Sequence, residues 1–177
     1  MTEMLRKAIL VVAALVAMVL VVPATATAAP YCGITWGSLT KSATPTVTGE
    51  MTGLRAGRHD CYDRLVFDFR GNSDGYHVQY ADQVYEDGSG RLVPLRGGAK
   101  LRIIAISPAY DQWGNPTYTF ANRDELVNVT GYQTFRQVAW AGSFEGQTTV
   151  GLGVRARLPF RVFTLPNRLV IDVAHSW

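Results

Sequence analysis

The 177-residue sequence has few of the residues from which catalytic and metal centres are usually built. It contains two cysteines and three histidines, His59, His77 and His175. It has no His-Glu-x-x-His, no Gly-x-Ser-x-Gly, no phosphate-binding glycine loop and no calcium loop of alternating Asp and Asn. The sequence therefore predicts a protein that is not an enzyme of a familiar class and that needs no metal or cofactor.

Blocks of one charge are also missing. The 17 Lys and Arg and the 14 Asp and Glu give a net charge of +3, and the basic residues are scattered along the chain. A nucleic-acid-binding protein usually carries its basic residues as an arm or a stripe. We therefore expect no nucleic acid among the partners.

Only one long hydrophobic run occurs, from Ala8 to Val22, directly after Arg6 and Lys7. As a helix this run would reach about 22 Å, which is short for a bilayer core of roughly 30 Å. Small residues at the Ala-x-Ala sites that end at Ala28 complete the pattern of a signal peptide. We predict that residues 1–28 are removed and that the protein is exported, with no permanent membrane span. An uncleaved signal anchor is the alternative.

The two cysteines, Cys32 and Cys61, would then enter an oxidising compartment, where pairs of this kind usually form disulfides. We predict that they pair. Cys32 lies in a segment rich in Thr, Ser, Gly and Pro, which we interpret as an extended N-terminal arm over residues 29–45. The disulfide would tie this arm to the main domain, residues 46–177.

That domain repeatedly alternates apolar and polar residues, as half-buried strands do. Turn sequences such as Asp87-Gly88-Ser89-Gly90 separate the alternating stretches. About ten short strands predict an all-β fold, a two-sheet β-sandwich. The clearest strands are 65–70, 150–155 and 169–174, and further candidates are 46–52, 76–85, 92–95, 100–106, 117–120, 136–141 and 160–165. One helical turn is expected around residues 123–127.

Several ordered segments resemble the AMIN-like domain of secreted actinobacterial proteins. They include GRHDCYDRLVFDFRG (57–71), DGSGRLVPLRGGAKLRIIAISPA (87–109), SFEGQTTVGLGVR (143–155) and PFRVFTLPNRLVIDVA (159–174). That domain is similar to the AMIN domain of N-acetylmuramoyl-L-alanine amidases, which directs its host proteins to peptidoglycan. The resemblance implies a β-sandwich and a non-catalytic role in the cell envelope, with a cell-wall glycan or an exported protein as the partner.

Charged residues flank the apolar strands and form a candidate structural network. A buried charge needs a partner, so we expect these side chains to converge, with Arg64 paired to a carboxylate. His59 also permits a catalytic reading, as a base beside acidic residues, and this is the alternative if the protein is an enzyme. The candidate residues are Arg58, His59, Asp63, Arg64, Glu145 and Asp172.

The segment 107–123 is the richest in aromatic and turn residues. Tyr110, Trp113 and Tyr118 are the candidate ligand-binding residues, because aromatic rings pair an apolar face with a polar tip, as sugars do. The simpler interpretation is that these rings cap an open end of the sandwich. A third possibility is an adaptor or inhibitor that binds another exported protein at a sheet edge.

Overall fold

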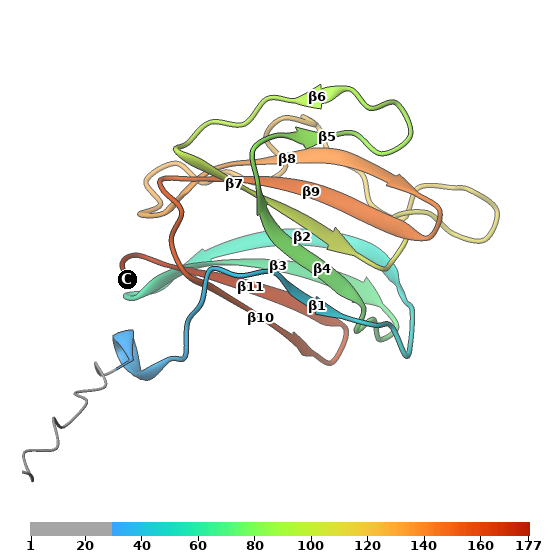
Figure 1. Cartoon of the computed structure of the whole chain (residues 1–177). Coiled ribbons are helices and arrows are strands. Elements are labelled where there is room, and N and C mark those ends of the chain that lie inside the picture. Colours follow the sequence, from blue (N-terminus) through green and yellow to red (C-terminus); the bar gives the residue numbers. More distant parts are fainter. Residues whose placement is uncertain (1–29) are drawn as a thin grey trace, which may run out of the picture.

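Alternating strands build two antiparallel sheets that pack face to face (Figure 1). The computed structural model describes residues 30–177, and the predicted signal peptide, residues 1–28, lies outside them. The five-stranded sheet has the spatial order β1 (Lys41–Ala43), β4 (Tyr76–Ala81), β7 (Ala99–Ala105), β9 (Gln147–Val154) and β8 (Phe135–Phe144). The four-stranded sheet has the order β10 (Phe160–Leu165), β11 (Arg168–Ala174), β3 (Tyr62–Arg70) and β2 (Glu50–Arg58). The prediction of an all-β sandwich is confirmed.

The core lies between the two sheets. On β3, Leu65 and Phe67 point inward and are fully buried, whereas Arg64 lies on the opposite face. Leu101 on β7 and Leu152 on β9 meet them from the other sheet as members of the same cluster. Burial of each such side chain stabilises the fold by roughly 1.5–3 kcal/mol.

A short ladder of β5 (Val84–Tyr85) and β6 (Leu92–Val93) covers the outer face of the five-stranded sheet. Val84 and Val93 are buried there in a small second core. A larger residue would not fit at Gly151 on β9, because its Cβ would lie 2.7 Å from Leu95 Cδ1. The glycines of the Gly-Leu-Gly sequence therefore let this covering segment approach the sheet.

The N-terminal arm begins with a single 3₁₀ turn, η1 (Tyr31–Gly33), and is fastened at several points. Cys32 and Cys61 form the predicted disulfide, with their Cα atoms 6.4 Å apart. The Phe160 amide donates to Gly37 O at 2.8 Å. The arm then enters the sandwich, because its residues 41–43 form the edge strand β1.

Some elements differ from the expected ones. Residues 117–120 form no strand and residues 123–127 form no helix. The backbone groups of this segment bond to other parts of the fold instead: Leu126 N donates to Val138 O at 2.8 Å, and Arg123 O accepts from Trp140 N at 2.7 Å. The 76–85 stretch is divided between β4 and β5, and β2 runs on through Gly57 to Arg58.

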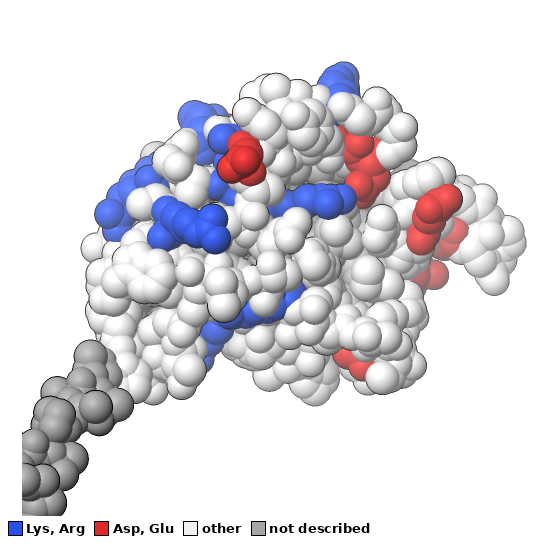
Figure 2. Space-filling view, viewed as in Figure 1, with Lys and Arg blue, Asp and Glu red and all other residues white. Residues whose placement is uncertain are grey.

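Charge is distributed unevenly over the face in view. Lys and Arg gather mostly toward the end of the sandwich that carries the C-terminus, and Asp and Glu lie mainly toward the opposite end (Figure 2). On this face, the two ends of the sandwich therefore present different electrostatic surroundings to a ligand.

Candidate functional site

A long segment without regular secondary structure, residues 106–134, connects β7 to β8. It joins the edges of both sheets: Pro108 O accepts from Met51 N on β2 at 2.7 Å, and Leu126 N donates to Val138 O on β8. Segments of this length in a compact domain usually carry function. This segment supplies Tyr118 and Phe120, whose rings pack against each other and against Trp140 on β8.

These aromatic side chains line a groove of about 460 Å³. Tyr118, Phe120 and Trp140 form its aromatic wall, with ring centroids 5.0 Å apart for Phe120 and Trp140 and 5.9 Å apart for Tyr118 and Trp140. Tyr110 and Pro116 also line the groove. We call this set the aromatic groove. Its volume lies within the roughly 300–1,000 Å³ of small-molecule sites.

Hydrogen bonds hold the groove in shape. Tyr110 Oη accepts from the amide of Gly146, which fixes the ring against the β8–β9 turn at 2.9 Å. Ser143 Oγ accepts from Ala109 N at 2.9 Å and also contacts Thr148 Oγ1 at 2.9 Å. These polar groups are therefore already used in the fold.

Two polar atoms of the residues that line the groove have no partner in the described part of the chain. Within residues 30–177, neither Tyr118 Oη nor Trp140 Nε1 forms a hydrogen bond. Burial raises the pKa of Tyr118, so its phenol stays neutral and can donate. The groove thus offers apolar ring faces with two free donors, a combination that fits a ligand with both apolar faces and hydroxyl groups.

Trp113 does not line the groove. It lies at the tip of a tight loop, with 77% of its surface exposed. Asp111 holds this loop by accepting from the amides of Trp113 and Asn115, each at 2.9 Å. The pKa of Asp111 is lowered, mainly because the Asn115 side chain donates to its carboxylate. Of the three predicted ligand-binding residues, the structure brings Tyr110 and Tyr118 together.

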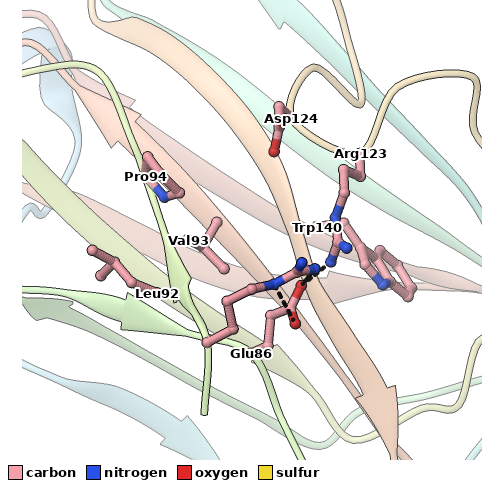
Figure 3. Close-up of a pocket in the computed structure, with 8 residues that line it drawn as sticks. Glu86, Leu92, Val93, Pro94, Arg123, Asp124 and Trp140 are labelled. Carbon is pink, nitrogen blue, oxygen red and sulfur yellow. Dashed lines mark hydrogen bonds and ion pairs between the residues drawn. The ribbon is translucent and has the colours of Figure 1, made fainter. Parts of the chain in front are cut away.

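A smaller cavity of about 220 Å³ is also lined by Trp140 (Figure 3). Glu86 is placed there between two arginines: Arg91 Nη2 lies 2.7 Å from its Oε1, and Arg123 pairs with the same oxygen. Leu92 and Pro94 form the apolar rim. Trp140 therefore lines both the aromatic groove and this pocket, in which Glu86 is paired with two arginines.

The predicted charge network contains one buried ion pair. Arg64 on β3 donates from Nε and Nη2 to Asp172 on β11, at 2.6 and 2.9 Å. These hydrogen bonds raise the pKa of Arg64. Arg161 donates to the same carboxylate at 2.7 Å. Asp172 is completely buried although it lies on the outer face of its sheet, because these two side chains cover it.

The other members of the predicted network lie elsewhere. Asp63 points into the sandwich and accepts from the Thr134 and Phe135 amides. The His59 ring stacks on Tyr62, with centroids 4.6 Å apart. Glu145 occupies the turn between β8 and β9. The six residues therefore do not converge on one network.

The geometry around His59 also lacks the partners of a catalytic base. No side-chain oxygen hydrogen-bonds to its ring within residues 30–177, and both cysteines are in the disulfide. The same part of the chain holds no group of three or more His, Cys, Asp or Glu side chains that could bind a metal.

Sequence reasoning missed three residues of these sites, Phe120, Trp140 and Arg161. Trp140 lies on β8, where the alternation of side chains directs it toward the core on the same face as Val138. From the sequence it therefore looks like an ordinary core residue. Arg161 alternates with Phe160 and Val162 on β10, which places it on the outer face beside Asp172. Only that alternation, combined with the pairing of β10 and β11, could have indicated the second arginine.

The fold and groove define a two-sheet antiparallel β-sandwich with a ligand-sized aromatic groove at one side. Within this class, the chain belongs to the AMIN-like domain family, whose model matches residues 49–175. Membership suggests a domain that targets the cell envelope. No curated protein and no solved structure matches the chain. Among residues 30–177 no helix is long and apolar enough to cross a bilayer.

Proposed function

We propose that this protein is an exported, non-catalytic domain that binds a cell-wall glycan in the aromatic groove. The observation that carries the proposal is the arrangement of Tyr110, Tyr118, Phe120 and Trp140 around one groove. Peptidoglycan, or a glycan attached to it, is the proposed ligand because the family suggests an envelope role.

The chemistry of the groove supports a saccharide. The faces of a sugar ring carry C–H groups that pack on aromatic rings, and its hydroxyls accept and donate at the edges. Tyr118 Oη and Trp140 Nε1 are free to meet such hydroxyls. Recognition of this kind needs no nucleophile and no metal.

Cosedimentation with purified cell walls tests the proposal. Phe120→Ala removes an exposed ring of the groove, and we expect it to weaken binding by about tenfold, the loss of about 1.4 kcal/mol. Tyr118→Phe keeps the ring and removes the free hydroxyl, so a smaller loss is expected. Soluble glycan fragments should compete with the cell wall for the wild-type protein.

Trp113→Ala is the matched control. It removes a larger and more exposed aromatic ring from the same segment, but one outside the groove. We expect little loss of binding. If Phe120→Ala bound cell walls as well as the wild type, or if Trp113→Ala alone abolished binding, the groove would not be the binding site.

Export is the other part of the proposal. The protein recovered outside the cell should begin at Ala29, after the predicted cleavage. Mass spectrometry of the exported protein measures this directly. An intact mass that includes residues 1–28 would instead favour an uncleaved anchor.

A further inference from the structure

A third cavity shares no lining residue with the aromatic groove and lies where the turn between β2 and β3 meets the C-terminus. It has a volume of about 530 Å³. Five of its lining residues have titratable side chains: Arg58, His59, Asp60, Asp63 and His175. We call it the Asp63 cavity.

Asp63 is completely buried and only half of its carboxylate is used. Oδ2 accepts from Thr134 N at 2.6 Å and from Phe135 N at 3.0 Å. Oδ1 is buried and accepts no hydrogen bond within residues 30–177. Leaving a buried carboxylate oxygen unpaired is costly, and a hydrogen-bond donor, ideally a cationic one, would satisfy it.

The opposite charge in the cavity is also unused. Eight arginines elsewhere in residues 30–177 form ion pairs. Arg58 and Asp60 form none, and the Arg58 guanidinium makes one long hydrogen bond of 3.4 Å to Gly131 O. The cavity therefore holds a cation and carboxylates side by side that do not neutralise one another directly.

Contacts within the fold hold the two histidine side chains that line the cavity. His175 is held at both ring nitrogens, Nδ1 at 2.9 Å from Thr134 Oγ1 and Nε2 at 2.9 Å from His59 O. The His59 ring is stacked on Tyr62. A site whose side chains are already ordered loses less conformational entropy when a ligand binds.

We propose that the Asp63 cavity binds an amino-acid or peptide group that carries both an ammonium and a carboxylate. The ammonium lies toward Asp63 and Asp60, and the carboxylate lies toward the Arg58 guanidinium. Such a ligand satisfies both unused charges at once. The proposal goes beyond glycan binding and uses no residue of the aromatic groove.

Titration of the isotope-labelled protein with alanyl-alanine, followed by NMR, tests this. We expect saturable shifts of the Gly131 and Asp60 amides. N-acetylated alanyl-alanine lacks the ammonium and alanyl-alaninamide lacks the carboxylate, so each should bind about tenfold more weakly. Equal shifts with the blocked dipeptides, or no saturable shift, would overturn the proposal; the second result would mean that water alone fills the cavity.

Variants identify the residues involved. Arg58→Gln and Asp60→Asn change exposed side chains and should each weaken dipeptide binding about tenfold without changing the fold. Asp63→Asn keeps an oxygen for the Thr134 amide and removes the charge. Arg168→Gln, an exposed arginine outside the cavity, is the matched control and should bind normally. Undiminished binding by Arg58→Gln would contradict the assignment.

The two proposals can fail separately. Phe120→Ala should reduce cell-wall binding and leave dipeptide binding unchanged. Loss of dipeptide binding in Phe120→Ala would contradict an independent site. Failure of glycan binding with normal dipeptide binding would reject the function proposed for the groove and support the Asp63 cavity.

Discussion

Arg64 and Asp172 lie opposite each other on the neighbouring strands β3 and β11, joined by two hydrogen bonds of 2.6 and 2.9 Å. The Arg161 guanidinium closes over the same carboxylate and lies 5.3 Å from the centre of the Tyr62 ring. The outer face of the four-stranded sheet thus contains a buried charge held between two cations. This pair has consequences for stability that an exposed ion pair would not have.

Asp172→Asn should destabilise the protein by about 3 kcal/mol, because two arginines then lack their anion in a partly buried place. Asp68→Asn is the matched control. Asp68 also pairs with an arginine, Arg55, through two hydrogen bonds on the same face, but it is partly exposed. Its loss should cost less than about 1 kcal/mol. Urea unfolding of both variants measures the difference; equal losses would contradict the role of burial.

Replacing both Cys32 and Cys61 by Ala should lower the free energy of unfolding by about 3.5 kcal/mol, on the model in which the disulfide restricts the unfolded chain. The bridge closes a loop with a sequence separation of 29 residues. Thermal unfolding with and without a reducing agent gives the same comparison in the wild type. Leu39→Ala changes an exposed arm residue and should have no effect. A double variant as stable as the wild type would mean that packing alone holds the arm.

Alkaline pH should weaken the fold through Tyr80. Burial raises its pKa to about 12, while its hydroxyl donates to Leu158 O at 2.6 Å. An unfolded tyrosine has a pKa of about 10. Because the folded pKa is higher, the stabilisation is fully present below pH 10 and is lost as the pH rises toward 12. Urea unfolding from pH 8 to 12 measures the slope, and Tyr80→Phe should make it shallower. An unchanged slope in that variant would assign the effect to other groups.

Gly153→Ala should destabilise the protein by about 3 kcal/mol, because the added Cβ would overlap the Arg96 carbonyl where the covering segment crosses β9. Gly57→Ala is the control, since its Cβ would come no closer than 3.8 Å to His59 Nε2. Thermal unfolding compares the two. Equal stability of both variants would mean that the segment around Arg96 moves aside easily.

Much of the fold could be predicted because each main strand has one buried face. β10 begins and ends where the sequence indicated, at Phe160 and Leu165, and β11 differs by one residue. The strand predicted at residues 117–120 and the helical turn predicted at residues 123–127 were wrong, because the backbone groups of these segments bond to distant parts of the chain. Thr117 N donates to Ala109 O at 2.9 Å, which makes a loop where local preference indicated a strand.

The candidate site could be predicted only in part. Tyr110 and Tyr118 belong to one aromatic segment, and composition was enough to single it out. Trp140 comes from β8, and nothing local in its strand indicates that residues 106–134 will lie against it. Trp113 lies in the same aromatic-rich segment and was predicted for the same reason, yet the loop held by Asp111 places it outside the groove.

Sequence alone determined the alternation that makes two sheets and the single pair of cysteines available to join the arm to them. Both are local or compositional properties, and burial of one face of a strand needs no knowledge of its partner. Tertiary structure decided which side chains meet. Arg64 and Asp172 are separated by 108 residues, and they form a buried pair only because the order of strands places β11 beside β3.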